Sequence, residues 1–90
     1  MQLGKALHSE NIWLKYRKTG DSLGRFSVAT PKKVSKKAVI RNRARRRVYS
    51  VIVPPKGIQG IFFVKNDLEA VTFPKLTEEV ASLLAKASLQ

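Results

Sequence analysis

The stretch KKVSKKAVIRNRARRRVY, residues 32–49, determines how the rest of the chain is organised. Nine of its eighteen residues are Lys or Arg, and none is acidic. The acid-free region is wider still, because no carboxylate side chain occurs between Asp21 and Asp67. Such a surface repels itself until a polyanion supplies counter-ions. The stretch therefore predicts a surface that binds nucleic acid.

The composition of the whole chain agrees with this prediction. Its 90 residues carry a formal net charge of +12 and have a pI near 10.7. This excess of positive charge is typical of nucleic-acid-binding domains. An anionic membrane surface is the alternative partner for such a charge. We expect one domain, residues 1–90, that buries roughly 60–65% of its unfolded surface. No apolar run reaches the roughly 20 residues that span a bilayer, and no signal-peptide pattern opens the chain. Together with the absence of Cys, this predicts a cytoplasmic protein without a membrane partner, disulfides or thiolate metal sites.

Residues 11–18 alternate between two kinds of side chain, a period typical of a β-strand. The expected inner face carries Ile12, Leu14 and Tyr16, and the expected outer face carries Trp13, Lys15 and Arg17. A Trp between two cations can serve as a stacking platform for a nucleobase. The alternative is that Trp13 closes a small core.

Residues 25–30 alternate again and predict a second strand, and a further short strand is expected at residues 6–9. The inward side chains are Phe26, Val28 and Thr30, and the outward ones are Arg25, Ser27 and Ala29. Small outward residues beside a cationic strand leave room for a ligand strand on the sheet. The alternative is that they are spacers beneath a loop.

Pro31 ends this strand, and Ser35 is expected to cap a helix that begins near Lys36. One stripe of that helix is apolar: Ile40, Ala44, Val48, Val51 and Ile52. The rest of its surface is basic or polar: Arg41, Asn42, Arg43, Arg45, Arg46, Arg47 and Tyr49. Like-charge pairs four residues apart cost a few tenths of a kcal/mol each, and a planar guanidinium can bind phosphate with two hydrogen bonds. The pattern therefore favours phosphate contact over a merely solvated helix face.

Pro54-Pro55 is predicted to end the helix. The apolar run at residues 60–66 predicts a central strand covered on both faces, with Phe62 and Phe63 in the core. A second helix is expected from about residue 74 to 87. Glu78 and Glu79 lie early in this helix, where the helix dipole stabilises negative charge, and we expect them to have a structural role. Its buried stripe is Leu76, Val80, Leu83, Leu84 and Ala87. This order of elements predicts an α+β domain in which helices pack on a sheet of three or four strands.

The acidic side chains form no evident catalytic set. A metal-dependent nuclease needs clustered carboxylates, and Asp67 and Glu69 beside a turn are a weak signal. His8 has no evident partner for acid–base chemistry. We therefore expect no catalytic residue, no metal held by the protein alone, and a polypeptide that binds without cutting.

Residues 32–47 resemble the signature of the protein subunit of bacterial ribonuclease P. Within them, residues 41–43 match its RNR motif and residues 32–34 its KKV element. The segments RFSVAT, NIWLKYRK, and GIFFVKND followed by TFPKLTEEVASLLAKA resemble the family's strands and last helix, so the resemblance covers about residues 4–87. It implies a two-layer α/β sandwich like a ribosomal-protein domain, with a three- or four-stranded mixed sheet and the basic helix in a left-handed βαβ crossover.

The resemblance also implies a division of labour. The RNA subunit hydrolyses precursor tRNA at the 5′ end of the mature tRNA, with Mg²⁺ bound through the RNA subunit and the substrate. The protein binds that catalytic RNA and holds the 5′ leader in a cleft between sheet and basic helix, without needing to oligomerise. The RNA contacts fall on Arg41, Asn42, Arg43, Arg45, Arg46, Arg47, Lys32, Lys33, Lys36 and Lys37. The leader cleft falls on Trp13, Lys15, Arg17, Arg25, Ser27, Ala29 and Lys33.

Three departures from the family pattern stand out. The family begins with a basic amphipathic helix that walls off the cleft, and this chain starts about where that helix should end, which predicts an exposed sheet face. Ser35 stands where Gly is usual, and Tyr49 where Arg is frequent.

Three other functions are alternatives to a ribonuclease P subunit. The first is a small basic ribosomal or architectural RNA-binding protein. The second is a helix-turn-helix DNA-binding module, for which Pro54-Pro55 leaves no adjacent helix, and the third is a protein-only nuclease.

Overall fold

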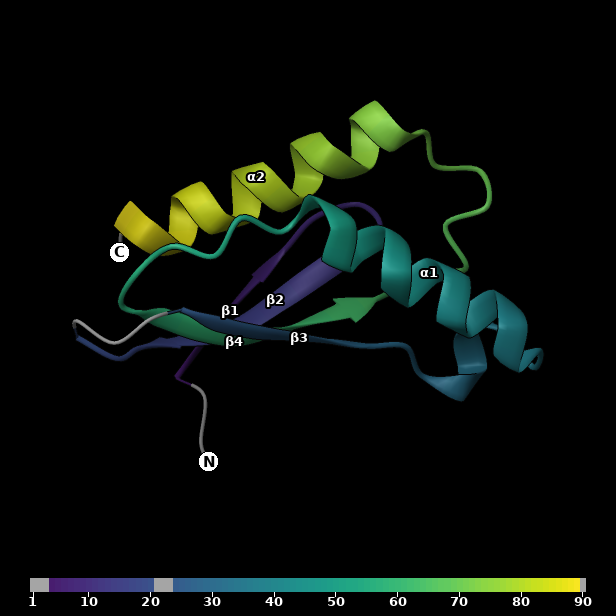
Figure 1. Cartoon of the computed structure of the whole chain (residues 1–90), viewed down its shortest axis with the longest axis horizontal. Helices are drawn as coiled ribbons and strands as arrows, with labels where there is room; N and C mark the ends of the chain where they lie inside the picture. Colours follow the sequence, from purple (N-terminus) through teal and green to yellow (C-terminus); the bar gives the residue numbers. More distant parts are fainter. Residues whose placement is uncertain (1–3, 21–23, 90) are drawn as a thin grey trace.

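A computed structural model describes residues 4–20 and 24–89, and in these the chain forms one mixed sheet beneath two helices. The elements are β1 (Lys5–His8), β2 (Ile12–Lys18), β3 (Arg25–Ala29), a 3₁₀ turn η1 (Lys32–Val34), α1 (Ala38–Val51), β4 (Ile58–Val64) and α2 (Phe73–Leu89). The strand order is β1-β2-β4-β3, with β3 parallel to β4 and the other pairs antiparallel. Both helices lie on the same side of the sheet (Figure 1). The predicted α+β fold is confirmed.

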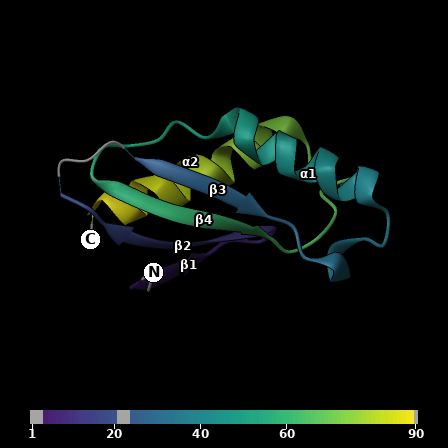
Figure 2. The ribbon, with the colours of Figure 1, turned by 60° about the horizontal axis from the view of Figure 1, so that its bottom comes forward.

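The connection from β3 through α1 to β4 has an uncommon hand. The chain leaves the end of β3, returns above the sheet as α1 and enters β4 behind β3 (Figure 1), and Figure 2 shows the same order of strands from another side. This path turns in the left-handed sense, whereas about 98% of such crossovers are right-handed. The left-handed crossover implied by the resemblance is therefore present.

The core lies between the inner face of the sheet and the helices. On β2, Ile12, Leu14 and Tyr16 are at most 1% exposed, which confirms the predicted inner face. From α1, Ala44 and Val48 complete the core over β3 and β4. The whole predicted stripe of α2 is buried: Leu76, Val80, Leu83, Leu84 and Ala87. The described helices are too short or too polar to cross a membrane.

Strand β4 is central, as predicted, but it is not covered on both faces. Its burial alternates along the strand, with Phe62 fully buried and Phe63 only partly buried. Successive side chains of a strand point to opposite faces, and α1 and α2 both lie on the inner side. The prediction that Phe63 belongs to the core is therefore wrong. The inner face also carries Gly60, where an added Cβ would lie only 2.5 Å from the Lys15 carbonyl oxygen.

The start of α1 also differs from the prediction. The helix begins at Ala38, Lys37 occupies the N-cap position, and no side chain caps it. Because the preceding residues form η1, Ser35 is extended with φ −163°. The Ser35 hydroxyl accepts a hydrogen bond from the Lys37 amide at 3.2 Å, and the Ser35 carbonyl accepts one from Arg41 Nη1 at 2.7 Å. Ser35 therefore shapes the approach to the helix. The helix ends at Val51, ahead of Pro54-Pro55 as predicted.

Glu79 is structural, as expected, but for a different reason. Neither Glu78 nor Glu79 lies in the first turn of α2, which begins at Phe73 and has no acid there. The Glu79 side chain is buried and accepts hydrogen bonds from Ser9 Oγ at 2.6 Å, the Asn11 amide at 2.8 Å and Asn11 Nδ2 at 2.7 Å. Burial raises the pKa of Glu79, but the bonds from Asn11 and Ser9, with a contribution from Lys75, outweigh it and leave the pKa below its ordinary value. The carboxylate thus fastens the β1–β2 turn to α2.

Candidate nucleic-acid interface

The outer face of the sheet is the side that α1 and α2 leave uncovered (Figure 2). Strand register arranges its side chains in three rows. The rows are His8, Trp13, Phe63 and Ala29; then Ala6, Lys15, Ile61 and Ser27; then Arg17, Gln59 and Arg25. The structure therefore brings together the six strand residues predicted for the leader cleft: Trp13, Lys15, Arg17, Arg25, Ser27 and Ala29.

Trp13 lies on the outer face and does not close the core. Its ring stacks on Phe63 with centroids 4.2 Å apart and on His8 with centroids 5.2 Å apart, and both pairs are 13° from parallel. The register puts His8 and Phe63 on opposite sides of Trp13, so protein rings cover both faces of the indole. His8 and Phe63 were not predicted from the sequence to be members of this surface. Strand parity was the signal that would have found Phe63.

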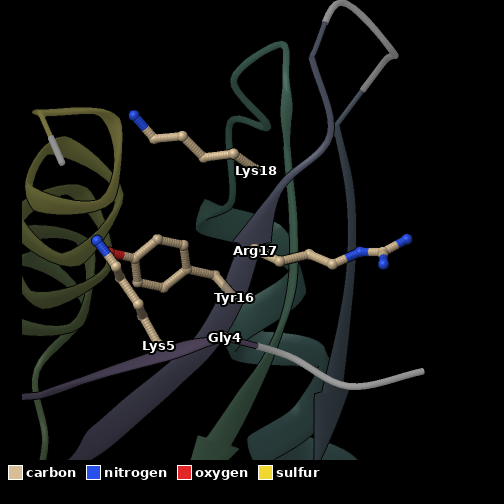
Figure 3. A pocket seen from close by; sticks show the side chains of 5 residues that line it. All are labelled: Gly4, Lys5, Tyr16, Arg17 and Lys18. Carbon is tan, nitrogen blue, oxygen red and sulfur yellow. The ribbon is translucent and has the colours of Figure 1, made fainter.

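Arg17 extends the cationic part of this face. Figure 3 shows Lys5, Tyr16 and Lys18 directed toward α2, whereas Arg17 points to the other side of the sheet. These residues and Gly4 line a pocket of about 240 Å³. When the Gln59 amide oxygen faces Arg17, it accepts hydrogen bonds from Arg17 Nε at 2.7 Å and Nη2 at 2.8 Å. This contact leaves three of the five N–H groups of the guanidinium unused and holds its charge on the outer face.

The arginines of α1 differ in how far the protein itself engages them. Arg46 is exposed, and the exposed Arg45 donates from Nη2 to Asn42 Oδ1 at 2.9 Å on the same helix. Arg43 pairs with Glu69 at 3.2 Å, with both side chains about half exposed. Among the described residues, Glu69 is the carboxylate that pairs with this helix. An exposed pair of this kind is worth at most about 1 kcal/mol, so a phosphate can replace Glu69.

Arg47 is engaged by the fold more than the other arginines of α1. It donates from Nη1 to the Leu68 carbonyl and from Nη2 to the Val71 carbonyl at 2.5 Å. Leu68 is fully buried at φ 61°, a left-handed conformation that a non-glycine residue rarely adopts. Asn66 Oδ1 accepts a hydrogen bond from the Leu68 backbone amide at 2.8 Å. Arg47 therefore stabilises the β4–α2 loop. Only its remaining N–H groups are available for the predicted contact with RNA.

Tyr49 connects the basic helix to the sheet. Its hydroxyl oxygen accepts a hydrogen bond from the Val28 amide at 3.2 Å. Strand β3 is an edge strand, and its other edge pairs with β4. The Tyr49 hydroxyl therefore satisfies an edge amide and fixes α1 against the strand that carries Ser27 and Ala29. From the sequence, Tyr49 was predicted to lie on the polar surface of the helix, and its contact with β3 was not predicted.

The predicted cleft between sheet and basic helix has a different arrangement. The apolar stripe of α1 packs on the inner side of β3 and β4, whereas the predicted leader residues of the strands lie on the outer side. The two surfaces meet at η1, beyond the end of β3, where the first turns of α1 project past the sheet (Figure 1). Four exposed lysines lie in and after η1: Lys32, Lys33, Lys36 and Lys37. A strand of nucleic acid on the outer face reaches α1 by passing these lysines.

No group of three or more His, Asp or Glu side chains that could hold a metal ion occurs within residues 4–20 and 24–89. The buried carboxylate, Glu79, has its oxygens occupied by Ser9 and Asn11. The chemistry of this surface is therefore that of hydrogen-bond donors, cations and aromatic rings.

Comparisons with known proteins agree with this geometry. The family model described as Ribonuclease P matches residues 1–88. The ribonuclease P protein component of Microcystis aeruginosa is 36% identical over 70 residues, which cover 72% of this chain, and that of Rippkaea orientalis is 28% identical over 83 residues, which cover 87%. The chain spans 58% and 65% of the lengths of these two relatives.

A solved structure shares the fold. The RNase P protein from Thermotoga maritima superposes with a TM-score of 0.81 at 28% identity, covering 92% of this chain and 83% of that one. The family match spans nearly all of the sequence, and the structural likeness includes the sheet and both helices. The chain therefore belongs to the ribonuclease P protein family.

Proposed function

We propose that this chain is the protein subunit of a bacterial ribonuclease P, which binds the catalytic RNA and the 5′ leader of precursor tRNA. In this role it assists Mg²⁺-dependent removal of the leader, and the polypeptide alone does not cleave RNA. The observation that carries the proposal is the series of exposed cations that leads from the outer sheet face over η1 to α1. Among the described residues, the salt bridge of this surface is the exposed one between Arg43 and Glu69. Membership of the family supports the same role.

The two parts of the surface suit two kinds of RNA. The outer face combines aromatic rings with Lys15, Arg17 and Arg25, which is the combination that binds unpaired strands through stacking and phosphate contacts. The exposed arginines of α1 present planar donor groups that fit phosphate oxygens in pairs. We assign the leader to the outer face and the folded RNA to α1, with the lysines of η1 between them.

The protein's contribution to cleavage is electrostatic in this account. Catalytic RNA, tRNA and leader repel one another, and the cations of η1 and α1 lower that repulsion where the three meet. Mg²⁺ would be held by phosphates of the RNA subunit and the substrate, and there it would supply the activation of the attacking water. Within residues 4–20 and 24–89, no three His, Asp or Glu side chains form a group that could hold a metal ion.

Salt dependence of binding tests this proposal. If about six cations contact phosphates, the logarithm of the affinity for precursor tRNA should fall with the logarithm of salt concentration at a slope of roughly −4 to −5. Fluorescence anisotropy with labelled precursor tRNA measures the slope, and mature tRNA without a leader is the control, which should bind more weakly with a shallower slope. A flat salt dependence, or equal affinity for both RNAs, would contradict the proposal.

A further inference from the structure

We propose that the outer face stacks one unpaired nucleobase on Phe63, above Ala29, and not on Trp13. This inference rests on the proposed function, because it specifies how the surface assigned to the leader holds a single-stranded RNA. Its ligand is an unpaired nucleotide, since a base inside a duplex is already stacked on its neighbours. Every base has a π-face, so this position accepts any of the four.

The rings on the outer face form a short column across the strands. His8, Trp13 and Phe63 come from β1, β2 and β4, and each ring is 13° from parallel with the next. Trp13 is the middle ring, so a base can stack on it only after displacing His8 or Phe63. Each displacement breaks a ring pair worth about 0.5–1.5 kcal/mol. The ends of the column are therefore the positions that accept a further ring.

At the Phe63 end, the residue across the sheet is too small to cover the ring completely. The parallel register pairs Phe63 with Ala29 on β3. Neighbouring strands lie about 4.8 Å apart, and the Ala29 methyl group is too short to cover the face of a ring that stands up from the sheet. Phe63 is accordingly half-buried, with part of its surface open to solvent. A base above Ala29 would continue the column by one member.

Charge favours the Phe63 end over the His8 end. Strand β3 ends at Ala29, and the exposed Lys32 and Lys33 follow within four residues, where they can reach the phosphates of a stacked nucleotide. His8 lies on the edge strand β1, the exposed Glu10 follows within two residues, and Lys65 Nζ donates a hydrogen bond to the intervening Ser9 carbonyl at 2.6 Å. The charge at the His8 end is therefore mixed, whereas the two lysines beyond Ala29 have no carboxylate after them in the sequence before Asp67 and attract a phosphate.

Two matched substitutions test the position. Ala29→Leu fills the space beside Phe63, and Ala85→Leu adds the same side chain to an exposed position of α2, on the other side of the sheet. The probe is a fluorescein-labelled, unstructured single-stranded RNA of about twelve nucleotides. We expect Ala29→Leu to bind it about 10-fold more weakly, in the range measured for loss of one base–aromatic stack, and Ala85→Leu to bind within about twofold of the unmodified protein. Phe63→Leu removes the ring but keeps an apolar residue, and should match Ala29→Leu.

A scan with abasic nucleotides makes the test specific. In the unmodified protein, removing the base at one position of the probe should weaken binding by the same factor of about 10. With Ala29→Leu that abasic probe should bind no worse than the complete one, because the stacked base is already excluded. Circular dichroism and thermal unfolding check that each variant is folded.

The outcomes separate this inference from the proposed function. Unmodified protein that binds neither the probe nor precursor tRNA would overturn both. Salt-dependent binding that Ala29→Leu and Phe63→Leu leave unchanged would overturn the inference alone. A loss with His8→Ala but not with Ala29→Leu would place the base at the other end of the column and would also overturn it.

Discussion

Replacing Arg45 and Arg46 together with alanine should weaken binding of ribonuclease P RNA roughly 100-fold at about 0.15 M salt. Each lost charge-assisted hydrogen bond to phosphate is worth about 1.5 kcal/mol, and the two together give a factor of that size. The salt slope should become shallower by about 1.5 to 2, because two fewer counter-ions are released on binding. Filter binding or anisotropy across a salt series measures both quantities.

The fold should survive this double substitution. Both side chains are exposed, and the bond from Arg45 to Asn42 lies on the surface of the same helix. The buried residues Ala44 and Val48 are untouched. A matched control removes the same charge from Lys56 in the loop before β4 and Lys86 in the last turn of α2, and should reduce affinity only a few-fold. Equal losses from the two pairs would show that net charge, and not the face of α1, binds RNA.

Replacing Glu79 with alanine should destabilise the protein more than any surface substitution. Three donors from Ser9 and Asn11 lose their acceptor, and the buried amide of Asn11 is one of them. The expected loss is about 3 kcal/mol, which corresponds to a fall in the unfolding temperature of roughly 12–24 °C for a chain of this size. The neighbouring Glu78 is exposed and provides the control, because Glu78→Ala should shift the unfolding temperature by only a few degrees.

Glu79 should also make stability depend on pH. Its pKa in the folded state lies below the ordinary value of 4.5, so the unfolded state binds the proton more tightly. The stabilisation is therefore complete above about pH 4.5 and is lost as the pH falls through the lower pKa of the folded state. Thermal unfolding between pH 7 and pH 3 should show a steeper decline for the unmodified protein than for Glu79→Gln. Parallel declines would show that Glu79 is not the group responsible.

The periodicity of apolar residues was enough to predict the elements that bury one face and expose the other. The inner face of β2 and the stripe of α2 were predicted residue by residue, because each element buries one face and the period follows from its geometry. The left-handed crossover came from the resemblance alone, since no local pattern encodes the hand of a connection. Residues 60–66 led to a wrong prediction of a strand covered on both faces, because a continuous apolar run does not show which face is buried. Phe63 is apolar and yet belongs to the outer face.

Contacts between residues distant in sequence were beyond prediction. Arg47 resembles the other arginines of α1, but the left-handed backbone at Leu68 brings two loop carbonyls within its reach. Glu79 resembles the exposed Glu78, and only the turn that holds Asn11 distinguishes them. Trp13 was placed beside cations by its neighbours in sequence, whereas its contacts are rings from two other strands. Each of these roles depends on the tertiary fold.

Reconstitution with a ribonuclease P RNA tests the central claim most directly. Precursor tRNA is incubated at limiting Mg²⁺ with the RNA alone, with the protein alone, and with both. The account predicts correct 5′ processing only when both are present, and recovery of the RNA-alone reaction when Mg²⁺ is raised, because the protein supplies binding and charge neutralisation while the RNA cleaves. Cleavage by the purified protein alone, or no stimulation of the RNA at limiting Mg²⁺, would contradict it.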